Sequence, residues 1–157
     1  MKRRRIVIAA ASLPVLAPLA WAHHGWSNFD QDRPIYLEGK VVRSRWQNPH
    51  AELMMEVSPG LKVPADLAKR TVPAQSSPVD GQALLAKAAV PRRADRQWEI
   101  ELAPLTRMEA WKVAEIKTGD TVSVVGFTFK EEKGEPVLRV EYLFANGKTY
   151  GLRSSPA

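Results

Sequence analysis

Apolar and polar residues alternate along most of the chain between positions 34 and 152, the pattern of half-buried β-strands. The alternation is cleanest at 50–57, where every second residue from Ala51 to Val57 is apolar. The same criterion predicts strands at 34–46, 50–57, 97–102, 121–129 and 136–144, and a short sixth strand that ends near 152. Asn146-Gly147 predicts a tight hairpin between the last two.

Three breaks in the alternation add detail. Within 34–46 the apolar phase shifts at Val41-Val42, just after Gly39, which predicts a bulge in a long, bent strand. Residues 104–116 have helical spacing. Residues 58–95 hold five prolines and no aromatic residue, so we expect a solvated Pro/Ala-rich insertion with one short helix capped by Asp80.

The order of these elements predicts a mainly β fold. Three strands, a helix and two further strands match a small OB-like five-stranded Greek-key barrel, with the helix between strands 3 and 4 and a C-terminal hairpin extension. An open meander with the helix packed on one face is the alternative. Ligands of such barrels usually bind on the face of the second and third strands. The candidate ligand-binding face is therefore Trp46, Asn48, Glu52 and Met54.

The N-terminus has the three regions of a secretory signal. Residues 1–5 are Met-Lys-Arg-Arg-Arg, residues 6–22 carry no charge, and the stretch ends Ala20-Trp21-Ala22. A membrane-spanning helix needs about 20 apolar residues, and Pro14 and Pro18 interrupt this shorter run. We therefore expect a cleavable signal peptide at 1–22 and a single domain at 23–157, with no membrane span after cleavage. The domain is expected to be exported, to the periplasm if the source is Gram-negative.

Cleavage changes the charge balance and the choice of partners. Of 23 basic side chains, Lys2 and Arg3–Arg5 belong to the signal, so 19 basic and 17 acidic side chains remain, a net charge of +2. This balance gives no support for a nucleic-acid partner, which needs a basic surface that neutralises many phosphates. The chain has no cysteine, so disulfides, thiolate metal sites and a cysteine nucleophile are excluded.

The histidines suggest a copper site. The chain has three, His23, His24 and His50, and cleavage after Ala22 gives His23 a free α-amine. That amine and the Nδ1 atom of the same residue can chelate Cu(II), and His50 can add a second imidazole, with His24 and Met54 as lesser candidates. The alternatives are weak copper binding by any histidine-rich terminus and a purely structural His50 that bonds the turn backbone.

The remaining aromatic and acidic residues have ordinary structural explanations beside functional ones. Trp98 and Trp111 fall on apolar faces and are expected in the core. Trp26 and Trp46 either line a pocket or staple the N-terminal segment to the barrel, and we favour the staple. If the second and third predicted strands pair, a group of carboxylates lies on their exposed side, and it consists of Glu52, Glu56, Glu99 and Glu101.

Several segments together resemble a family of short exported bacterial proteins of unknown function, DUF6152. They are residues 22–26 at the processing site, 35–41, the turn Trp46-Gln47-Asn48-Pro49-His50, 98–102, 119–122 and 146–148. The resemblance covers nearly the whole domain except 58–95, which looks like an enlargement. It implies export and a single domain, and it implies no activity.

We therefore expect an exported, non-enzymatic module that binds an unidentified small ligand or an envelope protein, with copper as its candidate cofactor. A copper-dependent oxidative enzyme and a structural envelope protein are the alternatives. No nucleophile elbow, phosphate loop or dinucleotide fingerprint is present, and the sequence names no catalytic residue.

Overall fold

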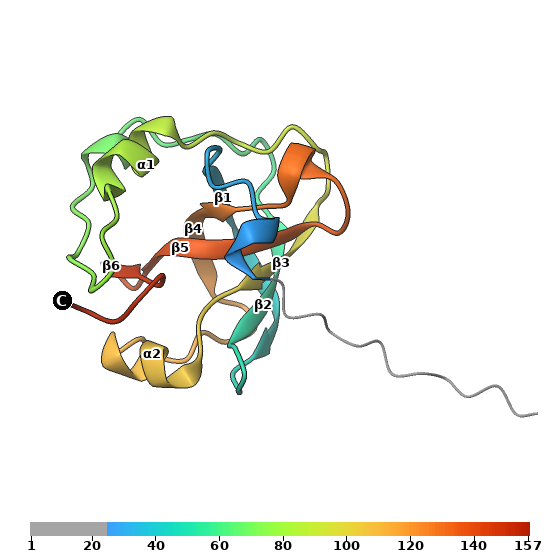
Figure 1. Ribbon diagram of the computed structural model, residues 1–157. Helices are drawn as coiled ribbons and strands as arrows, with labels where there is room; N and C mark the ends of the chain where they lie inside the picture. The colour runs from blue at the N-terminus through green and yellow to red at the C-terminus, as the bar shows by residue number, and fades with distance from the viewer. Residues whose placement is uncertain (1–24) are drawn as a thin grey trace, which may run out of the picture.

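The computed structural model describes residues 25–157, and these form a small β-barrel (Figure 1). Its strands all run close to the predicted positions. They are β1 (Ile35–Arg45), β2 (Glu52–Val57), β3 (Gln97–Glu101), β4 (Thr121–Phe127), β5 (Val137–Ala145) and β6 (Lys148–Gly151).

Strand pairing closes the barrel. The order is β3-β2-β1-β4-β5, and β5 returns to pair with β3, the one parallel contact in a ring that is otherwise antiparallel. β6 pairs only with β5 and lies outside the ring. The predicted OB-like barrel with a hairpin extension is therefore confirmed for residues 25–157, and closure leaves the five ring strands without a free edge.

β1 is long enough to pair with both β2 and β4 because it bends. Its register against β2 shifts between Val41 and Arg43, which confirms the predicted bulge. Gly39 lies where the strands approach most closely, since a Cβ atom there would stand 2.1 Å from the carbonyl oxygen of Glu56. Val41 continues the core face of Ile35 and Leu37, and the register shift after it turns Arg43 to the outer face.

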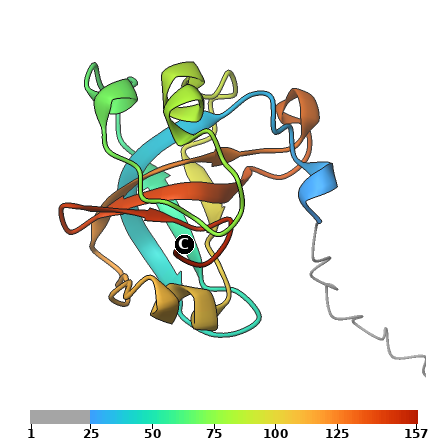
Figure 2. The same ribbon diagram turned by 60° about the vertical axis from the view of Figure 1, so that its left-hand side comes forward.

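The two α-helices lie at opposite ends of the barrel (Figure 2). α1 (Gly81–Lys87) begins as predicted at Asp80, whose carboxylate accepts the backbone N–H of Ala83. α2 (Leu105–Ala110) is shorter than the predicted 104–116. It ends because Lys112 adopts the left-handed conformation at φ 53°, which no continuing helix allows. Three 3-10 turns complete the helical structure of residues 25–157: η1 (Trp26–Asn28), η2 (Leu67–Lys69) and η3 (Lys130–Glu132).

The main core fills the barrel. Trp98 is fully buried there, as predicted, whereas Trp111 is only partly buried and donates its indole N–H to the carbonyl of Ser154 at 2.8 Å. The other large buried side chains come from every strand of the ring and include Ile35, Leu37, Leu53, Met55, Ile100, Val124 and Leu138.

The insertion forms a second core and is not simply solvated as we expected. Leu67 and Leu85 are buried, and they pack with Tyr36, Val125 and Tyr142 on the outer side of β1, β4 and β5. Composition pointed to a solvent-exposed segment because its apolar residues are sparse and have no clear period. A few leucines are nevertheless enough to cover one face of the barrel.

No helix within residues 25–157 is both long enough and apolar enough to cross a membrane.

Candidate functional site

A row of charged side chains crosses the outer face of the barrel where β3 ends. The strand register places Arg45 of β1 opposite Glu52 of β2, and Glu52 opposite Glu101 of β3. Glu101 in turn lies beside Arg139 of β5. Directly paired residues project from the same face of a sheet, so these four form a continuous line, which we call the charged row.

At each end of the charged row, an arginine and the neighbouring glutamate form an ion pair. Arg45 pairs with Glu52, and Arg139 pairs with Glu101. Arg139 and Glu101 are both buried, each with 8% of its surface exposed. In such a pair the mutual attraction offsets the lost hydration, so either charge without its partner would be strongly destabilising.

His50 lies next to the charged row. The backbone of Ala51 accepts from Leu102 and donates to Ala103, both at 2.9 Å, which fixes the β1–β2 turn against the end of β3. The Nδ1 atom of His50 is 3.7 Å from Oε1 of Glu101, and its side chain is 24% exposed. This separation exceeds a hydrogen bond but places a half-buried imidazole beside a carboxylate.

The first described residues lie against the outer face of β5, near the charged row (Figures 1 and 2). The ring centroid of Trp26 is 5.2 Å from the guanidinium carbon of Arg139 and 4.2 Å from that of Arg153. Phe29 is buried and stacks on Phe129 at 5.0 Å. These contacts attach the N-terminal segment to the barrel, the structural role expected for Trp26.

Two of the three histidines proposed as copper ligands, His23 and His24, lie outside the described residues. Within residues 25–157, no three His, Cys, Asp or Glu side chains gather closely enough to hold a metal ion. The copper site therefore stays a prediction, for which the structure gives the place of His50 and of the segment that follows His24.

A groove lies alongside the charged row. The register aligns Arg43 of β1 with Met54 of β2 and Met54 with Glu99 of β3. These three side chains, with Arg45 and Glu52, line a groove of ≈ 260 Å³ on the outer face of the three strands. It holds two guanidinium groups, two carboxylates and one thioether.

Glu99 is the electrostatically unusual member of the groove. Burial raises the pKa of its carboxyl, and the negative charges of Glu52 and Glu101 raise it further, against smaller opposing effects of Arg45 and Arg43. A carboxyl with a raised pKa in a groove is a feature that functional sites share.

The predicted ligand-binding face divides into two parts. Glu52 and Met54 line the groove. Trp46 instead packs partly against the main core. The amide oxygen of Asn48 accepts the backbone N–H of Leu105 at 3.3 Å, so Asn48 helps to hold the start of α2.

Sequence reasoning missed the arginines of this surface. Arg43 and Arg45 appeared as ordinary polar positions, although the predicted bulge was the signal that could have turned them to the outer face. Arg139 lies in a mainly apolar strand whose other charged residue is Glu141, and only the parallel β3–β5 pairing brings Arg139 to Glu101.

Residues 11–62 match the model of one protein family. That family is DUF6152, a family of unknown function. The match includes β1, β2 and His50, and it confirms the resemblance to DUF6152 over this segment. The resembling segments at 98–102, 119–122 and 146–148 lie beyond it. Searches of curated proteins and of solved structures gave no match.

Proposed function

We propose that the processed protein is an exported, non-enzymatic binding module that holds Cu(II) through His23 and His50. In this proposal, cleavage after Ala22 frees the amine of His23. The amine and the Nδ1 atom of His23 chelate the ion, and the imidazole of His50 provides a further nitrogen. Amine and imidazole nitrogens suit Cu(II), which also stands highest in the affinity order of the divalent first-row metals.

The observation that carries the proposal is a chain of three contacts from the N-terminal segment to His50. The Trp26 ring contacts Arg139, Arg139 pairs with Glu101, and Glu101 lies 3.7 Å from His50. His23 precedes Trp26 by three residues, and three residues of extended chain span about 10 Å. Trp26 is therefore anchored on the same side of the barrel as His50, which supports a His23 amine close enough to share an ion with His50.

The neighbour of His50 also suits a metal ligand. Histidines that bind metals commonly direct their second ring nitrogen to a carboxylate, which fixes the ring and makes it more basic. Here Nδ1 faces Glu101, so Nε2 is the atom expected to bind copper. Glu101 is itself held by Arg139, so the carboxylate has a fixed position.

The positions of the tyrosines favour a binding role for the proposed copper site over an oxidative one. Tyr36 and Tyr142 are buried beneath the insertion, on the outer side of β1, β4 and β5, and Tyr150 belongs to the main core. None of the three belongs to the cluster of Phe29, Phe127 and Val137 against which the N-terminal segment packs. A tyrosine that tuned oxygen chemistry would have to stand near the metal.

Calorimetric titration with Cu(II) tests the proposal on three proteins. The first begins at His23, the second carries a Gly-Ser-Gly-Ser-Gly extension before His23, and the third begins at His23 with His50→Ala. The extension has five residues because a single added residue would create a different copper chelate, with His24 at the third position. We expect one tight site in the first protein and affinities lower by more than about tenfold, or 1.4 kcal/mol, in the other two.

Equal, weak affinity in all three would overturn the proposal. Tight binding that the extension abolishes but His50→Ala leaves intact would show a terminal chelate without the barrel, and would refute the role of His50. Oxygen consumption with ascorbate, measured on the loaded first protein, should not exceed that of free Cu(II). A rate well above it would favour the oxidative enzyme instead.

A further inference from the structure

Within residues 25–157, every buried or half-buried glutamate except one has a hydrogen-bond or ion-pair partner for its carboxylate. Tyr36 donates its hydroxyl to Glu38 at 2.8 Å, and ion pairs join the other partnered glutamates to arginines: Glu52–Arg45, Glu56–Arg96, Glu101–Arg139, Glu132–Arg33 and Glu141–Arg153. Glu99 is half-buried as well, yet it forms no ion pair or hydrogen bond with any residue of 25–157. Leaving a charge partly desolvated without a partner costs stability, so its retention needs an explanation.

The arginines nearest to Glu99 do not neutralise it. Arg45 is engaged with Glu52, and Arg139 with Glu101. Arg43 of β1 is aligned with Met54 of β2, and Met54 is aligned with Glu99 of β3, so Met54 lies between Arg43 and Glu99. Strands are spaced about 4.8 Å apart, so the backbones of Arg43 and Glu99 are separated by nearly 10 Å. The two remaining neighbours, Glu52 and Glu101, are carboxylates themselves.

We propose that the groove of Arg43, Arg45, Glu52, Met54 and Glu99 binds an alkylammonium group. The ammonium pairs with Glu99, and the methylene chain lies over Met54, whose flexible thioether adapts to apolar groups of varied shape. This site is separate from the proposed copper site and does not depend on it.

Three properties of the groove select this chemistry. Glu52 is neutralised by Arg45, and Arg43 lies two strands away from Glu99, so Glu99 is the unpaired charge beside Met54 and attracts a cation there. Its volume of ≈ 260 Å³ lies below the usual range for whole drug-sized ligands, so it suits a group the size of one side chain. Met54 lies between Arg43 and Glu99 and gives an apolar surface beside the Glu99 carboxylate.

Two sources share this chemistry, a lysine side chain of a peptide or a free small amine. The probes are therefore Nα-acetyl-lysine-N-methylamide and cadaverine, with 1-pentanol as an uncharged control of similar length. Binding is followed by NMR of protein labelled at the methionine methyl groups, without added copper. Met54 reports on the groove, whereas Met55 and Met108 are buried in the core and serve as internal references.

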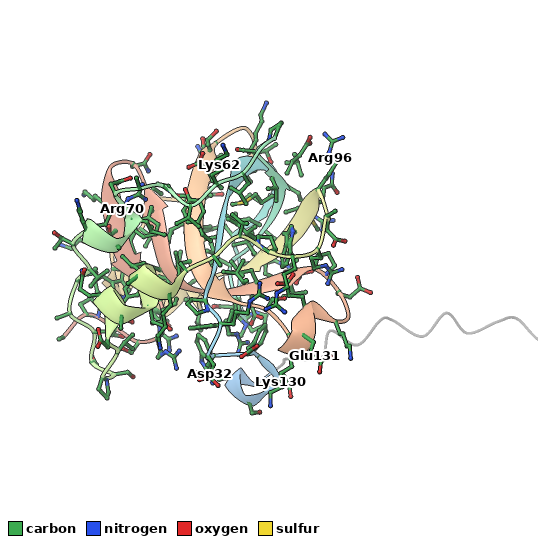
Figure 3. All side chains as sticks on the ribbon, turned by 90° about the horizontal axis from the view of Figure 1, so that it is seen from above. Asp32, Lys62, Arg70, Arg96, Lys130 and Glu131 are labelled. Carbon is green, nitrogen blue, oxygen red and sulfur yellow. The ribbon has the colours of Figure 1, made fainter. Side chains whose placement is uncertain are left out.

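Two variants complete the experiment. Glu99→Gln removes the proposed counter-ion with little change of shape. Glu56→Gln is the matched control, because Glu56 lies on the neighbouring strand β2, outside the groove, and pairs with the exposed Arg96, which projects from the rim of the molecule (Figure 3).

We expect a saturable shift of the Met54 methyl signal with at least one amine and none with 1-pentanol. Affinity should fall about fivefold or more in Glu99→Gln and stay unchanged in Glu56→Gln. Binding of the lysine amide alone would identify a peptide lysine as the source, and binding of cadaverine alone a free amine. The absence of a saturable shift with both amines, or equal affinity in Glu99→Gln, would overturn the proposal. The copper titration is independent of either result.

Discussion

Replacing Arg139 by methionine tests the buried centre of the charged row. Methionine keeps most of the side-chain volume against Trp26 and Phe29, so the main change is loss of the positive charge beside Glu101. Because Glu101 is 8% exposed, its carboxylate would remain almost without water and without a paired charge, with the His50 imidazole 3.7 Å away. Breaking a buried pair in this way costs about 3–5 kcal/mol.

The assay is urea unfolding at pH 7, supported by thermal unfolding. For a domain of this size the same loss lowers Tm by about 10–20 °C. Neutralising the second partner separates charge from packing, because Arg139→Met combined with Glu101→Gln leaves no unpaired charge. We expect the double variant to recover at least about half of the lost stability, a coupling energy of about 2 kcal/mol.

A local readout connects the pair to the N-terminal segment. The backbone N–H of Asp30 donates to the carbonyl of Thr128 at 2.9 Å, close to the segment that Arg139 contacts. Hydrogen exchange at Asp30 should accelerate in Arg139→Met by more than the global loss of stability explains. A cost below about 1 kcal/mol, or a double variant no more stable than Arg139→Met, would refute the buried-pair reasoning.

Three further substitutions have defined outcomes. Glu99→Gln should stabilise the protein at pH 7, because burial and the neighbouring carboxylates raise the pKa of Glu99 in the folded state. The ionised carboxylate then lowers the free energy of unfolding. This loss is absent below the ordinary glutamate pKa and complete above the raised pKa. Urea unfolding from pH 4 to 8 should show the gain growing with pH, and a constant gain would contradict this. Glu132→Gln should destabilise the protein. Burial raises the pKa of Glu132, but two backbone N–H donors and Arg33 outweigh that effect and lower it. The difference in unfolding free energy between wild type and variant should therefore shrink as the pH falls below about 4. An unchanged difference at low pH would count against that view. Gly39→Ala should unfold more readily by about 2 kcal/mol or more in the same assay, because its Cβ would stand 2.1 Å from the Glu56 carbonyl oxygen; a loss below about 0.5 kcal/mol would show that the strands relax.

The barrel could be predicted from the sequence because each of its strands carries its own local pattern. Alternation located the five ring strands to within two residues at every end, and the shift at Val41-Val42 located the bulge. The helix at 104–116 was overextended, since apolar spacing continues past Ala110 while the backbone turns at Lys112. Local patterns do not record such a change of backbone conformation.

The insertion and the charged row could not be predicted for a different reason. Both depend on contacts between residues distant in the sequence. Leu67 and Leu85 find their partners on β1, β4 and β5, and Arg139 reaches Glu101 only through the parallel closure of the barrel. The sequence did indicate that Glu99 and Glu101 share one face, but not that arginines neutralise one and leave the other unpaired.

Pulsed EPR of the Cu(II) complex, on the protein that begins at His23, tests the central claim most directly because it counts the imidazoles bound to the ion. The account predicts two, from His23 and His50, and therefore one in His50→Ala, with His24→Ala unchanged. Two imidazoles in His50→Ala, or a loss in His24→Ala instead, would contradict a site shared between the processed terminus and the barrel.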